Sequence, residues 1–390
     1  MLLCKIRAVI DELNVEIAER EELIECIFIA LLTKINVFIL GRTGQAKSHV
    51  INEIRKRIVG AKQFERLLSK QTDEDVLFGR IDLKSLLNGI PKMITTGKIP
   101  DAHIVFLDEI FKSNDAVLNS LLTVLNERRY TNEGEVIDIP AISFMAASNE
   151  IPNFNNADEQ ILRPLYDRFE LKIVTQYIKD RDNRLRLLER KQRGESGQIA
   201  STITLDDLYT IQKEVASVSV PASINELMDD ILCDLRGLGI HVSDRKFLNY
   251  YPMAQAKAWL NGRSTIEPAD LSVMQFYFWT TEEDIPVIRK VLDKYCLSPL
   301  QVEIKEIISL ADESYNEFNT NIAAGATATS SMIKLREELK RVYRMVNKPL
   351  SNSINETDEA AIKKAFDELE EISKIAHNRA GFDYVPLKLL

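Results

Sequence analysis

The sequence predicts an α/β protein whose mainly parallel sheet is followed by helical regions. Short apolar runs recur at residues 36–40, 104–107, 142–148 and 171–174, with helix-like segments between them. Strands that alternate with helices are typical of a parallel sheet that is covered on both faces. After about residue 180 these runs stop, and charged, helix-forming residues follow. We therefore expect an αβα core over residues 1–180, an all-α domain over 181–284 and a helical extension over 285–390.

The segments outside the sheet follow the same order along the chain. Residues 5–32 have apolar positions at helical spacing and predict two amphipathic helices before the first strand. The small-polar stretch 323–331 predicts a loop. A last helix is expected to begin near Thr357, because two acidic residues follow it and acidic residues favour a helix N-terminus.

Composition excludes several classes of protein. Hydrophobic residues make up 45% and charged residues 28% of the chain, which indicates a globular protein rather than a disordered one. The four cysteines are far apart and form no CxxC pair, so we expect reduced thiols and no zinc site. We find no signal peptide and no apolar run long enough to span a membrane, and expect a cytoplasmic protein. The net charge of −9 argues against a nucleic-acid-binding protein.

A phosphate-binding loop follows the first strand directly. Backbone N–H groups of such a loop and of the following helix N-terminus surround phosphate oxygens, and glycine permits the close approach. A plain strand-turn-helix with a capping serine is the competing interpretation, but the flanking strand and helix favour the P-loop. The loop consists of Gly41, Arg42, Thr43, Gly44, Gln45, Ala46, Lys47 and Ser48.

The residue types in this loop predict ATP and Mg²⁺ as ligands. Lys47 would neutralise the β- and γ-phosphates, and Ser48 would coordinate Mg²⁺. Ala46 stands where the P-loop pattern has glycine. We expect this departure to matter little, because the methyl group is small and left-handed backbone angles are not required there.

Two carboxylates end the second apolar run, at Asp108 and Glu109. Ligands bind at the carboxyl ends of the strands in open α/β sheets, and adjacent strand residues point to opposite faces. Asp108 would hold Mg²⁺, and Glu109 would act as the general base toward the attacking water. A strand that simply runs into a solvated loop would give the same pattern, but a P-loop about 60 residues earlier favours the catalytic interpretation.

A third polar strand end is Asn149, which follows the run at 142–148. Its amide would orient the attacking water and sense the γ-phosphate. The competing interpretation is a turn-forming asparagine after a strand.

The segments GRTGQAKS, IVFLDEIFKSNDAVLNSLLTVLNERRY, AASNEIP and LYDRF occur in this order. In order and spacing they resemble the MoxR family of AAA+ ATPases, and within it the RavA branch, over residues 5–280. The resemblance implies an AAA+ αβα core, an all-α lid and a ring that is usually a hexamer. It also implies an arginine finger at Arg168, with Arg163 as an alternative, that reaches the ATP of a neighbouring subunit. Arg245 in the lid is similar to the sensor-2 arginine, which would contact the γ-phosphate of its own subunit.

The same resemblance suggests what the ATPase works on. Residues 78–100 and 128–140 match elements that line the ring and contact substrates, and the second segment independently predicts a hairpin around Asn132-Glu133-Gly134. The family implies a chaperone-like remodelling ATPase that acts on protein partners, often with a von Willebrand factor A-domain protein. Two alternatives stay open at this point: a nucleotide-dependent assembly module with little turnover, and a nucleic-acid motor.

Overall fold

The computed structural model describes residues 1–89, 92–132, 135–194, 197, 199–325, 327–347 and 356–389. The chain forms two compact units, Met1–Val291 and Leu292–Leu390. The first unit contains a parallel sheet and the helices around it, and the described elements of the second unit are all helices. The expected α/β architecture with a helical C-terminal region is thereby confirmed. The boundaries at residues 180 and 284 remain a prediction.

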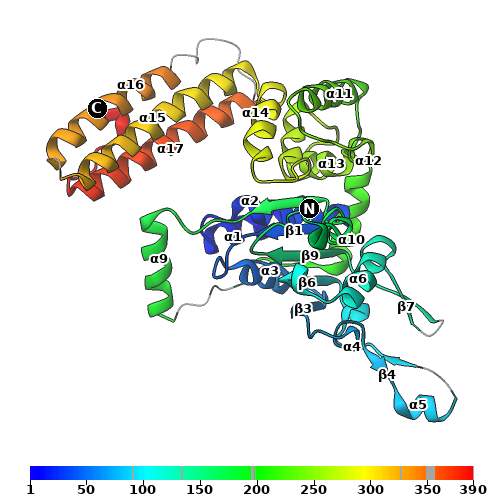
Figure 1. Ribbon diagram of the computed structural model, residues 1–390. Coiled ribbons are helices and arrows are strands. Elements are labelled where there is room, and N and C mark those ends of the chain that lie inside the picture. Colours follow the sequence, from blue (N-terminus) through cyan, green and yellow to red (C-terminus); the bar gives the residue numbers. More distant parts are fainter. Residues whose placement is uncertain are drawn as a thin grey trace. The chain divides into compact units, whose positions relative to one another are not determined.

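A five-stranded parallel sheet lies at the centre of the first unit (Figure 1). Its strands follow the order β10-β1-β9-β6-β3, and every neighbouring pair is parallel. The carboxyl ends of all five strands therefore meet at one edge of the sheet. The strands are β1 (Val37–Leu40), β3 (Gln63–Leu67), β6 (Ile104–Asp108), β9 (Ser143–Ser148) and β10 (Leu171–Val174).

Four of these strands lie at the expected apolar runs, which confirms that prediction. Most of their residues are apolar because the helices that cover the sheet exclude water from them. Every residue of β1 and β9 is buried. Helix α2 (Glu21–Thr33) packs on β1 and β10, and α3 (Lys47–Lys56) packs on β6. Strand β3 was not expected. It lies at the edge of the sheet and buries only Phe64, so its sequence QFERL lacks the continuous apolar run of a central strand.

The two expected N-terminal helices are α1 (Leu2–Glu16) and α2. Nine of the thirteen residues of α2 are buried, since the sheet covers one side and helices of the lid region cover another. The Gln212 side chain donates a 2.7 Å hydrogen bond to the Leu31 carbonyl and so joins the lid region to α2. Helix α10 (Leu205–Ala216), which carries Gln212, begins at a capping box formed by Thr204 and Asp207.

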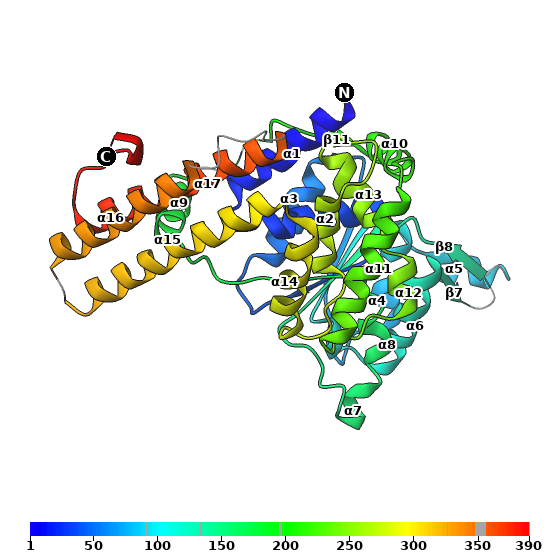
Figure 2. The ribbon, with the colours of Figure 1, turned by 90° about the horizontal axis from the view of Figure 1, so that it is seen from above.

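Five further α-helices follow the sheet along the chain. All but the first of them lie near α10 (Figure 2), whereas the first, α9, stands apart from that group (Figure 1). Two of these helices, α12 and α13, follow each other closely between Asp244 and Leu260. Pro252 stands in the first turn of the second helix, where its missing N–H is not needed. These helices are α9 (Arg181–Gln192), α11 (Ala222–Gly237), α12 (Asp244–Leu248), α13 (Tyr251–Leu260) and α14 (Asp284–Cys296).

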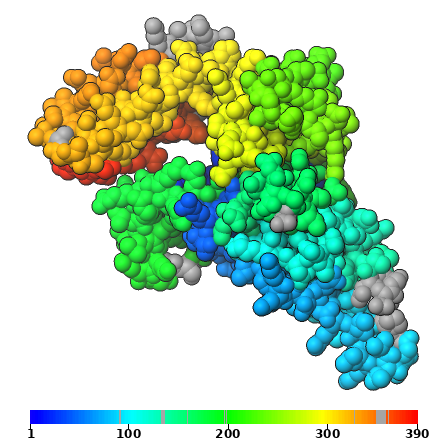
Figure 3. Space-filling model, in the orientation of Figure 1, coloured from blue at the N-terminus to red at the C-terminus, as the bar shows by residue number. Residues whose placement is uncertain are grey.

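Two elements project from the sheet (Figures 1 and 3). In one, the antiparallel strands β4 (Arg80–Ile81) and β5 (Met93–Ile94) flank the short helix α5 (Leu83–Leu87). In the other, β7 (Arg129–Asn132) and β8 (Glu135–Asp138) pair antiparallel, as the hairpin prediction requires. The predicted turn residues Glu133 and Gly134 lie outside the described part of the chain.

The remaining described α-helices and strands of the first unit are short, except for one helix that follows the acidic strand β6. This helix, α6, begins at an N-cap formed by Asn114, whose side chain accepts from the Val117 N–H. The elements are β2 (Ile58–Val59), β11 (Ile203–Thr204), α4 (Glu74–Phe78), α6 (Asp115–Glu127), α7 (Ala157–Gln160) and α8 (Arg163–Tyr166).

The second unit is built from three long helices that share one apolar core. They are α15 (Pro299–Ala323), α16 (Ala328–Asn347) and α17 (Glu356–Ala380). The expected last helix is therefore confirmed. The predicted loop over 323–331 is too long, because α16 already begins at Ala328. At this helix start the hydroxyl groups of Thr327 and Ser330 form a hydrogen bond with each other. Within the described residues, no helix is long and apolar enough to cross a bilayer.

Candidate functional site

The predicted P-loop connects β1 to α3 at the carboxyl edge of the sheet. Gly41 is packed so closely that a Cβ atom would lie 2.0 Å from Thr175 Oγ1 and 2.3 Å from Gln45 Oε1. Gly44 has a φ of +85°, which a residue with a side chain rarely adopts. Gly41 therefore leaves room for the Thr175 and Gln45 side chains, and Gly44 gives the loop its left-handed turn.

The expectation for Ala46 is wrong. This residue has a φ of 61° and a ψ of 23°, so it adopts the left-handed conformation directly before α3. The chain needs this angle to turn from the loop into the helix. For a residue with a Cβ atom the left-handed conformation costs roughly 1–2 kcal/mol.

Lys47 is the first residue of α3 and is 7% exposed. Its ammonium group donates to the Gly41 carbonyl across the loop. Burial lowers the pKa of Lys47 from its ordinary value, and the nearby carboxylates of Asp108 and Glu109 partly oppose this change. A buried cation that faces its own loop and two carboxylates is placed to neutralise a phosphate group.

The acidic strand end and the third strand end meet beside the loop. Strands β6 and β9 are neighbours, with Asp108 opposite Ala147, so Glu109 and Asn149 project from the same edge. The Asn149 amide donates a 2.6 Å hydrogen bond to Glu109 Oε1 and lies 3.4 Å from Thr43 Oγ1. The three predicted site segments therefore come together in the structure.

The carboxylates at this edge are held in defined positions. Asp108 Oδ1 accepts from the Glu109 N–H at 3.0 Å, and Glu109 adopts a left-handed φ of 54°. The second oxygen of Glu109 lies 3.2 Å from the Lys112 ammonium. In the described residues, the buried Oδ1 atom of Asn149 has no hydrogen-bond partner. An acceptor that lacks a donor fits a site that receives a water molecule or a hydrated ion.

A cavity of about 500 Å³ lies beside the P-loop in the first unit. Its wall is joined to the loop, because Arg20 donates to the carbonyls of Gln45 (3.3 Å) and Gln176 (2.7 Å). Thr175 also donates to the Gln45 side chain at 2.7 Å. Sequence reasoning missed this cavity, since its wall comes from three separate segments with no shared motif. The segments include residues 19–23, 172–177 and 275–289.

Arg168 and Arg245 lie elsewhere. Both line a cavity of about 510 Å³ that also includes Asn36, the residue directly before β1. The P-loop follows the other end of this four-residue strand, so Asn36 and the loop are joined by a strand about 13 Å long. The structure does not bring Arg245 to the P-loop of its own chain, contrary to the expectation. Its guanidinium instead lies 3.9 Å from Glu170.

Arg163, the alternative candidate, is exposed at the start of α8. Its guanidinium lies 6.0 Å from the centre of the Phe154 ring. It is not part of the cavity that contains Arg168 and Arg245. The choice between Arg163 and Arg168 therefore stays a prediction, although only Arg168 shares a cavity with a second predicted arginine.

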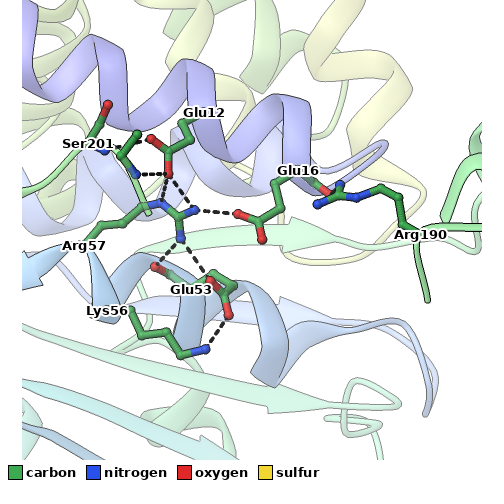
Figure 4. Close-up of polar contacts among 8 residues, drawn as sticks. Glu12, Glu16, Glu53, Lys56, Arg57, Arg190 and Ser201 are labelled. Carbon is green, nitrogen blue, oxygen red and sulfur yellow. Dashed lines mark hydrogen bonds and ion pairs between the residues drawn. The ribbon is translucent and has the colours of Figure 1, made fainter. Parts of the chain in front are cut away.

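A buried ion cluster anchors the far end of the P-loop helix (Figure 4). Arg57, directly after α3, is 0% exposed and donates to the carboxylates of Glu12 and Glu16 on α1 and of Glu53 on α3. Burial alone would raise the pKa of Glu12, but the N–H groups of Ala200 and Ser201 and the guanidinium of Arg57 hold it below its ordinary value. This cluster fixes α3 to α1.

Comparisons with known proteins agree with this geometry. The family model of the MoxR domain in the MoxR-vWA-beta-propeller ternary systems matches residues 4–213. A model of the AAA lid domain matches residues 204–292. An uncharacterised protein of Methanocaldococcus jannaschii is 32% identical over 378 residues, which cover 91% of this chain and 95% of that protein.

Two more distant likenesses extend the comparison. A chloroplastic magnesium-chelatase subunit of Arabidopsis thaliana is 24% identical over 246 residues, 57% of this chain and 55% of that subunit. The structure of a candidate ATPase from Cytophaga hutchinsonii superposes with a TM-score of 0.61 at 18% identity. It covers 75% of this chain and 94% of its own, and so supports the fold.

Proposed function

Because the chain belongs to the MoxR family of AAA+ ATPases, we propose that it binds ATP with Mg²⁺ at the P-loop and hydrolyses it. The observation that carries this proposal is the meeting of three strand ends. Thr43 of the loop, Glu109 after β6 and Asn149 after β9 are connected through the Asn149 amide. A solvated strand end would not place a buried lysine, two carboxylates and an amide around one glycine-rich loop.

Each residue then has a role that its position supports. The loop N–H groups and Lys47 bind the phosphates, and Ser48 and Asp108 are the residues that would hold Mg²⁺. The ion would neutralise charge on the phosphate oxygens. Glu109 accepts a proton from the attacking water, while the Asn149 amide fixes the carboxylate and orients that water. The cavity lined by Arg20 and Thr175 accommodates the nucleoside end of ATP, because it adjoins the loop.

Hydrolysis in this proposal requires a second copy of the chain. Arg168 lies at the opposite edge of the sheet from its own P-loop, so it would reach the γ-phosphate bound by a neighbouring subunit in a ring. An arginine supplied in this way accelerates phosphoryl transfer by about 10³–10⁵. Arg245 shares the cavity with Arg168, and we therefore propose that it also acts on the neighbour's nucleotide rather than on its own.

The work done with ATP is proposed to be the remodelling of protein partners. The projecting element between β4 and β5 exposes Leu83 (72%) and Leu87 (88%), which are suited to apolar protein segments. The matching family model describes systems with a von Willebrand factor A-domain protein, and we propose such a protein as the partner. The proposed division is core 1–180, lid 181–284 and extension 285–390.

Phosphate release by the wild type and by Glu109→Gln tests the proposal. We expect the variant to retain ATP but to lose at least about 10²-fold in turnover, because the general base is gone. Glu127→Gln, at the end of α6, is the matched control and should behave as wild type. Equal rates in wild type and Glu109→Gln would leave an assembly module with little turnover as the better description.

A further inference from the structure

Asn36 joins three separate segments at the edge of the sheet that lies away from the P-loop. The side chain is 6% exposed. Its Oδ1 atom accepts from the Phe144 N–H of β9 at 3.2 Å and from an Arg128 guanidinium nitrogen at 2.6 Å. Its Nδ2 atom donates to the Arg168 carbonyl at 3.1 Å. One buried amide thus connects β9, the end of α6 and the segment that carries the proposed arginine finger.

Arg128 holds this amide from the other side. Its guanidinium lies 4.6 Å from the centre of the Phe144 ring, and it donates to the carbonyls of Lys34 (3.3 Å) and Leu125 (3.4 Å). Burial lowers the pKa of Arg128 to about 10, which leaves it charged at neutral pH. The Arg128 backbone is left-handed, with a φ of 55°, and this angle ends helix α6 directly before β7.

The contact with Asn36 holds the backbone of Arg168 and not its side chain. The Arg168 backbone is held by Asn36, whereas the buried Nε atom of Arg168 has no hydrogen-bond partner in the part of the chain that the structure describes. A fixed backbone with an uncommitted guanidinium is what a residue needs if it is to meet a phosphate on another molecule. Misplacement of a reacting group by about 1 Å can reduce a rate by roughly 10²-fold.

We propose that Asn36 and Arg128 are positioning residues for ATP hydrolysis, and that they fix the Arg168 backbone so that its guanidinium meets the nucleotide of a neighbouring subunit. This inference rests on the proposed function, in which Arg168 acts on the neighbour. The two residues act through Arg168 and do not touch the nucleotide of their own subunit, because the P-loop lies beyond the other end of β1.

Asn36→Asp separates this role from a purely structural one. The aspartate has the same size and keeps both acceptor contacts, to Phe144 N–H and Arg128, but it cannot donate to the Arg168 carbonyl. We expect the kcat of Asn36→Asp to fall by about 10–10²-fold, because the Arg168 backbone, which positions the guanidinium, is no longer held in place. The affinity for ATP should stay unchanged, because the P-loop of the variant is intact. Asn225→Asp is the matched control, since that exposed side chain accepts from Tyr250 and would continue to do so.

Mixing subunits shows where the defect acts. Asn36→Asp subunits retain Glu109, and Glu109→Gln subunits retain a correctly held Arg168. In a 1:1 mixed ring about a quarter of the interfaces combine the two intact parts, so activity should recover to about a quarter of wild type. Arg168→Ala mixed with Glu109→Gln is the reference, and it should recover in the same way.

The outcomes distinguish the two claims. Recovery in the Arg168→Ala mixture but not in the Asn36→Asp mixture overturns the positioning role and keeps the proposed function. No recovery in either mixture contradicts the action of Arg168 on a neighbour. If Asn36→Asp does not fold, Arg128→Met gives the same test, because it removes the guanidinium that holds the Asn36 amide; full activity of Arg128→Met overturns the inference.

Discussion

Replacing Arg57 by methionine should destabilise the first compact unit strongly. The guanidinium has five N–H groups, and it makes five hydrogen bonds to Glu12, Glu16 and Glu53. Arg57 is 0% exposed, and the three glutamate side chains are only 18%, 15% and 8% exposed. Methionine fills part of the space but leaves three carboxylates close together without their shared cation.

The size of the effect follows from what each carboxylate retains. Glu12 keeps the N–H groups of Ala200 and Ser201, and Glu53 keeps Lys56. The Glu16 carboxylate has no other described partner. Removal of one member of a buried ion pair costs about 3–5 kcal/mol. Because two of the three carboxylates are partly compensated, we expect a loss of about 3 kcal/mol.

Urea unfolding followed by tryptophan fluorescence measures this loss. Both tryptophans, Trp259 and Trp279, lie in the first compact unit, so the signal reports on that unit alone. Arg55→Met on the same helix is the matched control and should change the free energy of unfolding by less than about 0.5 kcal/mol. Equal effects of the two substitutions would refute the claim that the cluster stabilises α3.

The pH dependence gives an independent check. Burial would raise the pKa of Glu53, but hydrogen bonds from Lys56 and Arg57 hold it below its ordinary value. Arg57 contributes in the same direction to the lowered pKa of Glu12, after the N–H groups of Ala200 and Ser201. Stability from a carboxylate with a lowered folded pKa is present above its unfolded pKa of about 4.3 and is lost as the pH falls through the folded value. The difference between wild type and Arg57→Met should therefore be largest near pH 7 and should shrink below about pH 4.

Two other predictions concern stability. Ala46→Gly should raise the free energy of unfolding by about 1 kcal/mol in the same assay, because the exposed alanine holds a left-handed φ; a decrease would contradict the strain argument. Lys172→Met should also stabilise, by roughly 1–4 kcal/mol, since burial lowers the pKa of this 1% exposed lysine well below its ordinary value. The unfolded chain then binds a proton that the folded chain does not, so this gain should shrink as pH rises toward about 10, and a constant gain would be inconsistent with a buried titrating lysine.

Sequence reasoning succeeded where burial or backbone chemistry restricts the residue type. The strands β1 and β9 are buried at every position, so their apolar runs stand out, and the glycine-rich loop follows β1 directly. It failed for the edge strand β3, in which only Phe64 is buried. It also failed for Ala46, since no local pattern specifies a left-handed angle at an alanine.

The candidate site was only partly predictable for a similar reason. Glu109 and Asn149 each follow a strand directly, and Lys47 begins the helix after the loop that follows β1, so the common edge of a parallel sheet brings them together. The placement of Arg245 depends on how the lid helices pack against the core, and no local sequence pattern encodes that packing. The Asn36 amide was missed because a single polar residue before a strand gives no periodic or motif signal.

A crystal structure of the Glu109→Gln variant with ATP and Mg²⁺ would show directly whether the P-loop is the nucleotide site. We expect ATP bound at the loop from Gly41 to Ser48, with the Lys47 ammonium moved from the Gly41 carbonyl to the phosphates. We also expect Arg168 of a neighbouring copy at the γ-phosphate. ATP bound elsewhere, or an Lys47 ammonium that still contacts only the Gly41 carbonyl, would contradict the proposed function.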